Sequence, residues 1–302
     1  SSFHTESLFF SLQLLLIILL IKPSTGIFYN LLLGAIITLM FLQKTVSFLY
    51  IFIIIFYLIL YFKLKSIKPV LIISFIYIFA LVSIGYANYK RAGVFYFMPT
   101  QGSEAIFHYL AKPILTKSQN ISDGDAQQIL DHDLNNWINE NNIKNINIEQ
   151  NRINFFKYKK EYTLDLIKNN LATSLKIISW KSIQTGILSP QYIFYYHYKE
   201  HDRNVRPYYL KKDFYNFWMP IQLVYSLIIY LVIILGFLNS LKNLNWKFNL
   251  FLVTSALYMF CILGWVGNSR YFSPSLIYLS FYFGYGIKFL INMKFLNKFK
   301  NS

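Results

Sequence analysis

Three ionisable residues stand at the ends of apolar runs, where side-chain chemistry in a membrane would have to take place. Glu6 precedes the first run, Lys44 follows the second, and Arg270 lies just before the last. Ionisable groups at membrane depth are costly to bury and are therefore functional candidates. A cation there can stabilise a lipid phosphate, and a carboxylate can accept a proton. The alternative is that Lys44 and Arg270 only extend to the outer headgroups.

Arg270 lies within the sequence Gly-Asn-Ser-Arg-Tyr-Phe-Ser-Pro, a polar turn whose proline opens the last apolar run. Proline in the first turn of a helix costs no hydrogen bond, so this pattern predicts a sharply defined helix start. A guanidinium held there can bind a phosphate through two parallel hydrogen bonds. We therefore interpret Arg270 as a candidate lipid-phosphate ligand.

The apolar runs that would position these residues have roughly the length needed to cross the hydrocarbon core. The sequence is 55% hydrophobic and only 14% charged, whereas a soluble domain carries about a quarter charged residues. We predict an all-α, polytopic membrane protein of about seven spans. The predicted spans cover 7–21, 27–42, 45–62, 69–86, 218–238, 248–266 and 272–290.

Charge placement predicts which connections share a side of the membrane. Basic residues cluster in alternate connections, which the positive-inside rule makes cytoplasmic. The net charge of +16 is therefore interpreted as attraction to anionic membrane lipids, not to nucleic acid. The remaining connections, with Glu6, Lys44 and Arg270, then lie outside, and we expect an inner or plasma membrane location. The clustered residues are Lys22, Lys63, Lys65, Lys68, Lys242, Lys247, Lys288, Lys294, Lys298 and Lys300.

The chain is predicted to have three parts. Residues 1–86 hold four spans, 87–217 form a mostly helical extracytoplasmic loop domain, and 218–302 hold three spans and a basic tail. In the loop, Ser122 precedes Asp123 and Asp125, which predicts a capped helix. The acidic residues have a cation site as their alternative, but the glycine and distal glutamate of a calcium loop are missing.

A second loop feature is an amphipathic helix near 164–185, where apolar residues recur at three- and four-residue steps. We expect it in the outer membrane interface, with packing in a soluble core as the alternative. The aromatic residues between 192 and 218 that follow it are typical of an interfacial belt, and a sugar-stacking platform is the alternative.

Known soluble enzyme motifs are missing from the sequence. It has no phosphate-binding glycine loop and no HExxH, its five histidines are scattered, and Cys261 is the single cysteine. No metal site is predicted, no cofactor is evident, and a requirement for a divalent metal stays open. The chain begins with Ser1 and enters an apolar run without a signal-peptide pattern, so we expect an N-terminally truncated protein.

The order of these features resembles the C-terminal two-thirds of the polytopic GT-C glycosyltransferases, which include protein mannosyltransferases and aminoarabinose transferases. Leu171 stands where that family has proline, and Lys44 stands where arginine is commoner. The pieces that carry the resemblance are Thr5-Glu6, Leu33-Gly34, Leu42-Gln43-Lys44, Leu166-Ile167-Lys168-Asn169-Asn170 and Ser269-Arg270-Tyr271-Phe272-Ser273-Pro274.

The resemblance implies a transferase that moves a sugar from a polyprenyl-phosphate donor to a lipid, glycan or protein acceptor on the outer face. It implies that Arg270 and Lys44 face the donor phosphate, that Glu6 and Tyr271 lie at the cavity on the acceptor side, and that the catalytic carboxylate precedes this chain. Two alternatives remain: a transporter or lipid flippase, and a non-enzymatic membrane protein of glycan assembly.

Overall fold

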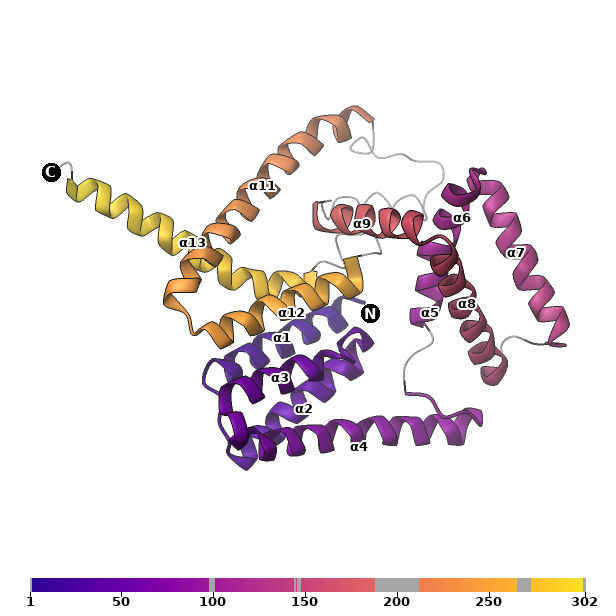
Figure 1. Ribbon diagram of the computed structural model, residues 1–302, viewed down its shortest axis with the longest axis horizontal. Coiled ribbons are helices and arrows are strands. Elements are labelled where there is room, and N and C mark those ends of the chain that lie inside the picture. Colours follow the sequence, from indigo (N-terminus) through magenta and orange to yellow (C-terminus); the bar gives the residue numbers. More distant parts are fainter. Residues whose placement is uncertain are drawn as a thin grey trace. The chain divides into compact units, whose positions relative to one another are not determined.

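The described part of the chain is almost entirely helical. The computed structural model describes residues 2–97, 101–143, 145, 148–187, 212–264 and 273–300. In these ranges there is no strand, and the only non-α helical segments are the 3-10 turns Thr45–Ser47 (η1) and Lys63–Ser66 (η2) and the π-turn Phe107–Ala111 (η3). The prediction of an all-α protein is therefore confirmed (Figure 1).

The chain divides into two compact units, which we describe separately. We call residues 1–76 with 183–302 the bundle unit, and residues 77–182 the loop unit. Each of the seven apolar runs expected as a span coincides largely with a helix. These helices are α1 (Ser2–Ile21), α2 (Ile27–Gln43), α3 (Tyr50–Phe62), α4 (Ile67–Ala92), α11 (Lys212–Asn243), α12 (Trp246–Gly264) and α13 (Ser273–Lys300).

Two helical segments are long and apolar enough to cross a membrane, Thr45–Ala92 and Leu223–Asn243. Only 33% and 11% of their most apolar windows are buried inside the protein, whereas the core helix of a soluble protein is mostly buried. Glu6–Ile21, Ile27–Gln43 and Trp246–Ile262 are apolar but shorter. Length and composition thus support association with a membrane, and the count of seven spans stays a prediction.

A chain of buried hydrogen bonds links four helices of the bundle unit. Tyr278 of α13 donates to the hydroxyl of Tyr50 on α3 (2.7 Å), which donates to Ser255 of α12 (2.9 Å). Gln13 of α1 donates to the Tyr278 hydroxyl and to the Pro274 carbonyl, both at 3.3 Å. Because a buried polar group without a partner is costly, these bonds favour one relative position of the four helices.

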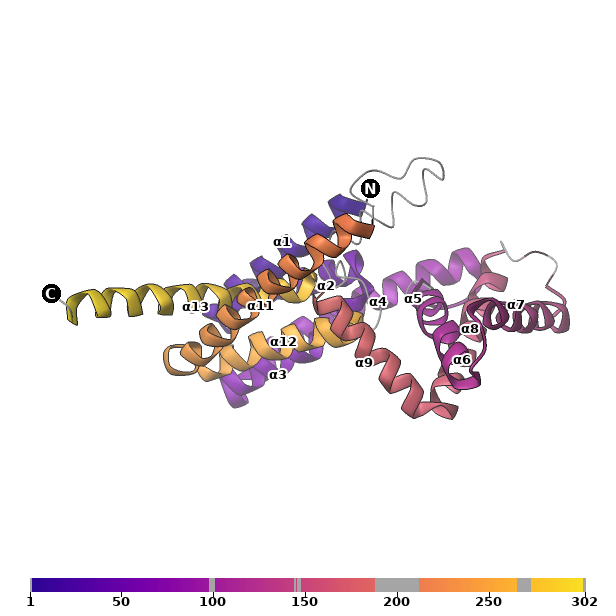
Figure 2. The ribbon, with the colours of Figure 1, turned by 90° about the horizontal axis from the view of Figure 1, so that it is seen from above.

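Two glycines allow α11 and α13 to cross in close contact (Figures 1 and 2). A Cβ atom at Gly236 would overlap the backbone carbonyl of Tyr282, and one at Gly286 would overlap the carbonyl of Val232. Small residues at such crossings let helix backbones approach in membrane proteins. At Gly284, also on α13, an added Cβ would have no atom within 4 Å.

The loop unit has its own small hydrophobic core, consisting of Phe107, Ala111, Leu115, Ala126 and Leu130. The predicted cap is confirmed, because the Ser122 hydroxyl accepts the Asp125 N–H (3.1 Å) and the Asp125 carboxylate accepts the Ser122 N–H (3.3 Å). The loop unit contains residues 77–92 of α4 and residues 171–182 of α9 (Leu171–Ile187). Its other helices are α5 (Gln101–Ile106), α6 (Lys112–Gln119), α7 (Asp123–Glu140) and α8 (Glu149–Asn169).

The helix expected near 164–185 is not continuous, so that prediction was wrong in its bounds. It is divided between α8 and α9 at Asn170, whose side chain and N–H both donate to the Leu166 carbonyl at 3.1 Å. An asparagine side chain that competes for backbone groups ends a helix without disturbing the apolar spacing on either side. On α9, Lys181 donates to the Tyr109 carbonyl (2.8 Å), and burial lowers the pKa of this lysine.

The loop unit also contains a nearly buried lysine. The Lys159 ammonium lies 2.8 Å from Glu104 and has a side-chain exposure of only 9%, whereas that of Glu104 is 49%. The same ammonium lies 5.1 Å from the ring centre of Phe107, 4.5 Å from Phe155 and 5.8 Å from Phe156. The aliphatic part of the Lys159 side chain thus fills part of the core, and Glu104 and the ring faces stabilise the charge of its ammonium.

Removing Glu104 should therefore lower the free energy of unfolding more than replacing Lys159 by an apolar side chain of similar length. We expect Glu104→Ala to destabilise the loop unit by about 1 to 3 kcal/mol, because it leaves a buried ammonium without its carboxylate, whereas Lys159→Met should be near neutral. Thermal unfolding measures both. Glu161→Ala, which removes the partner of the exposed Lys157 (3.9 Å), is the control and should change stability by about 0.5 kcal/mol or less. A larger loss for Lys159→Met than for Glu104→Ala would contradict this account.

Candidate functional site

The structure brings together two of the residues singled out from the sequence, Glu6 and Lys44. The Lys44 ammonium lies 3.6 Å from a Glu6 carboxylate oxygen, and the two side chains are 24% and 20% exposed. Glu6 lies near the beginning of α1 and Lys44 directly follows α2, so the antiparallel pairing of these helices places both at one end of the bundle unit. We call this end the Glu6–Lys44 end.

Backbone hydrogen bonds hold Lys44 in a defined position. It ends α2 in an extended conformation (φ −142°, ψ 111°), and its N–H donates to the Met40 carbonyl at 2.9 Å. Its own carbonyl accepts from the Ser47 N–H (3.0 Å) and the Ser47 hydroxyl (2.6 Å). Because both the N–H and the carbonyl of Lys44 are hydrogen-bonded, its backbone needs little rearrangement when the ammonium binds an anion.

Aromatic rings surround the ammonium of Lys44. It lies 5.5 Å from the ring centre of Phe9 and 5.9 Å from that of Phe10, both on α1. Rings at this distance attract a cation through their faces and displace water from it. Because the dielectric constant is lower in such surroundings, the attraction between Lys44 and an anion is stronger than on an open surface.

The end of α12 lies near the same turn. Tyr258 of α12 donates to the Val46 carbonyl (2.6 Å) and accepts from the Leu49 N–H (3.1 Å), just after Lys44. Arg270 and Tyr271, the other two predicted site residues, follow α12 in the sequence and lie outside the described residues. The aromatic residues from 192 to 211 also lie outside them.

Four buried polar atoms within the bundle unit have no hydrogen-bond partner in the described part of the chain: Oε1 of Gln13 on α1, Oδ1 of Asn30 and Oγ1 of Thr38 on α2, and Oγ of Ser275 on α13. Buried polar atoms are nearly always satisfied by protein or by an ordered water. Each of these atoms can therefore accept a hydrogen bond from water or from another polar group.

Two of the lysines predicted to be cytoplasmic, Lys63 and Lys247, lie at the opposite end of α3. The Lys247 ammonium lies 5.5 Å from the ring centre of Tyr61, and Lys63 directly follows α3. Since α3 has 13 residues, it separates this end from the Glu6–Lys44 end by about 20 Å. Glu6 and Lys44 thus lie at one end of the bundle unit, and Lys63 and Lys247 at the other.

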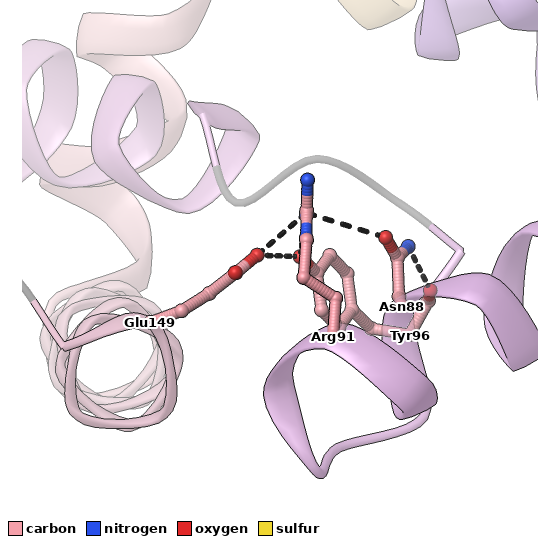
Figure 3. A network of polar contacts seen from close by, with 4 residues as sticks. All are labelled: Asn88, Arg91, Tyr96 and Glu149. Carbon is pink, nitrogen blue, oxygen red and sulfur yellow. Dashed lines mark hydrogen bonds and ion pairs between the residues drawn. The ribbon is translucent and has the colours of Figure 1, made fainter.

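An ion-pair network in the loop unit was not expected from the sequence. Arg91 at the end of α4 lies 2.6 Å from the carboxylate of Glu149 at the start of α8, and donates to the Tyr96 hydroxyl at 2.9 Å (Figure 3). Tyr96 also donates to Glu149, and Asn88 donates to the Tyr96 carbonyl (2.6 Å). The partners Arg91 and Glu149 are 58 residues apart, so no local pattern reveals them.

The electrostatics of this network point to a structural role. The hydrogen bond from Tyr96 lowers the pKa of Glu149, with Arg91 adding to the effect, and burial raises the pKa of Tyr96. A carboxylate held in its charged form by two donors is a poor proton acceptor. The network therefore joins the end of α4 to the start of α8 and supplies no general base.

The loop unit also has a polar pocket of about 310 Å³ between the end of α7 and the beginning of α8. Trp137 stacks on Tyr158 in it, with ring centres 4.9 Å apart and planes at 17°. No sequence pattern predicted this pocket, and the asparagine-rich stretch from 135 to 154 was the available signal for it. Its lining includes Trp137, Asn141, Asn151, Asn154, Lys157 and Tyr158.

No group of three or more histidine, cysteine, aspartate or glutamate side chains that could hold a metal ion occurs among the residues that the structure describes. Comparisons with protein-family models, with curated proteins and with solved structures found no match to the chain. What the chain does must therefore be inferred from its own residues and geometry.

Proposed function

We propose that this chain belongs to an integral membrane glycosyltransferase. In this proposal a sugar moves from a polyprenyl-phosphate donor to a lipid, glycan or protein acceptor on the outer face of the membrane. The observation that supports it most directly is the Glu6–Lys44 pair, a cation and a carboxylate 3.6 Å apart at one end of an apolar helix bundle. Ionisable pairs in such a setting usually mark a substrate site.

The proposed membrane arrangement uses the seven apolar helices α1, α2, α3, α4, α11, α12 and α13 as spans. Many of their large apolar side chains face outward, among them Phe28 (88% exposed), Phe52 (62%) and Phe75 (71%). In water this surface would be costly, whereas in lipid it is the expected surface of a span. The positive-inside rule then places Lys63 and Lys247 in the cytoplasm and the Glu6–Lys44 end outside.

The proposed chemistry assigns a role to each charged residue at the outer end. When the bond between the anomeric carbon and the phosphate oxygen breaks, negative charge develops on the phosphate, and a fixed cation stabilises that charge most in the transition state. Lys44 is held for this role by its backbone and by Glu6, and Arg270 would supply a second cation. Glu6, with Tyr271, lies on the acceptor side in this proposal, and the carboxylate that takes the proton from the acceptor is not assigned to a described residue.

Replacing Arg270 tests the proposed phosphate contact. We expect Arg270→Ala in the full-length protein to lower sugar transfer by about 100-fold or more, the usual effect of removing one preorganised donor to a developing charge. Turnover of a lipid-linked sugar in proteoliposomes measures it, and Arg270→Lys should recover part of the rate because it keeps the charge.

The same assay separates the proposal from its alternatives. Membrane insertion of Arg270→Ala should equal that of the wild type, which protease protection of the loop checks. Unchanged turnover in Arg270→Ala would exclude the phosphate role. Movement of the lipid across the bilayer without transfer of sugar would identify a flippase instead.

A further inference from the structure

The lysine-rich end of the bundle unit contains a groove that the proposed transfer reaction does not use. It has a volume of about 610 Å³ and lies where α3 ends, η2 turns into α4, and α12 begins. Apolar side chains supply most of the surface, and two ammonium groups lie among them. The lining includes Ile59, Lys63, Leu64, Ile67, Trp246 and Lys247.

The two lysines have no carboxylate near them in the sequence. No acidic residue occurs between Glu6 and Glu104 or after Asp213, so the segments that form the groove carry no negative side chain at all. Lys63 and Lys247 form no ion pair in the described part of the chain. An anion that balances these two charges must therefore come from outside the chain.

The backbone of Lys63 indicates that its side chain has a use. Its φ of 53° with a ψ of −127° is a conformation that glycine adopts with less strain than any residue with a side chain. Lysine at such a position is less favourable than glycine for the turn alone. Lys247 is held differently, with its ammonium 5.5 Å from the ring centre of Tyr61 and 5.9 Å from that of Trp246.

The remaining surface of the groove is strongly apolar and exposed. Leu64 is 86% exposed, Ile67 60% and Trp246 61%. Tryptophan at such a level is typical of the boundary between headgroups and acyl chains. The groove thus combines positive charge at its polar rim with an uncovered apolar wall, which matches a ligand that has an anionic head and a hydrocarbon tail.

We propose that this groove binds an anionic phospholipid, with the phosphate against Lys63 and Lys247 and an acyl chain along Ile59, Leu64 and Ile67. Basic pockets between membrane helices on the cytoplasmic side are known to take anionic headgroups. The site lies at the end of α3 opposite to Glu6 and Lys44. It therefore stands or fails independently of the sugar-transfer proposal.

Native mass spectrometry of the purified full chain in detergent tests the site, with phosphatidylglycerol and phosphatidylcholine of the same acyl chains as probes. The test variant is Lys63→Gln/Lys247→Gln, because glutamine keeps a long side chain on the same backbone and removes the charge. The control is Lys68→Gln/Lys242→Gln, which removes the same charge nearby without touching the groove lining. Thermal unfolding without added lipid checks that both variants fold.

We expect the wild type and the control variant to bind phosphatidylglycerol alike, and more tightly than phosphatidylcholine. The test variant should bind phosphatidylglycerol at least about tenfold more weakly, since each lysine near an anionic headgroup contributes roughly a factor of five. Equal weakening in the control would show diffuse attraction in place of a site. Equal binding of the two lipids, or displacement of the lipid by millimolar inorganic phosphate, would also overturn the proposal.

Discussion

Lys44→Ala in the full-length protein is expected to lower sugar transfer from a polyprenyl-phosphate donor by about 100-fold or more. The reason is that a cation fixed by its backbone and partly shielded from water stabilises the departing phosphate without rearrangement. Its ammonium lies 3.6 Å from Glu6 and within 6 Å of two phenylalanine ring centres. In the alanine variant, water in its place would stabilise the charge on the phosphate less well than the ammonium does. The measurement is turnover at saturating donor in proteoliposomes.

Two further variants separate charge from structure at this site. Lys44→Arg keeps the cation and should retain most of the rate. Glu6→Gln keeps the shape but removes the carboxylate that helps to hold Lys44, so it should lower kcat less than Lys44→Ala does and also raise the acceptor KM. Lys65→Ala, which removes a lysine at the other end of α3, is the matched control and should be fully active. If Lys44→Ala kept wild-type turnover at equal protein level in the membrane, the proposed phosphate role would be wrong.

Gly236→Ala and Gly286→Ala are each expected to destabilise the bundle unit by about 3 kcal/mol or more. The added methyl group would overlap a backbone carbonyl of the other helix, Tyr282 in the first case and Val232 in the second. A backbone atom cannot turn away as the end of a flexible side chain can, so α11 and α13 must separate along their whole contact. Thermal unfolding in detergent measures the loss.

Gly284→Ala is the matched control for this prediction. It lies on α13 two residues from Gly286, and an added Cβ there meets no atom within 4 Å. Because alanine is a better helix former than glycine, this variant should be neutral or more stable by roughly 0.5 to 1 kcal/mol. If all three variants were equally stable, α11 and α13 would not cross at these glycines.

The sequence alone was enough to predict the apolar helices and the start of α7, because the signals that determine them are local. Long apolar runs bounded by polar turns indicated each helix of the bundle unit, and the hydroxyl of Ser122 three residues before Asp125 indicated the start of α7. The break at Asn170 was missed because apolar spacing continues across it. Periodicity reports which face of a helix is apolar, and it is insensitive to a single residue that ends one helix and begins the next.

The candidate site could be predicted only in part. Charge placement put Glu6 and Lys44 on one side of a membrane, but the spacing of residues within the chain cannot give a distance between α1 and the end of α2. Their separation of 3.6 Å follows from how the two helices pack. The pairing of Arg91 with Glu149 and the polar pocket beside Trp137 likewise depend on segments that the chain brings together only when it folds.

By itself the sequence determined that this protein is helical and strongly apolar, and that lysines cluster in alternate connections between its apolar runs. Composition and short-range spacing control those properties. The tertiary structure decided which charges meet, where Gly236 and Gly286 let two helices touch, and that Lys63 and Lys247 border one groove. These contacts join residues distant in the chain. They depend on the shapes of packed helix surfaces, which no local pattern encodes.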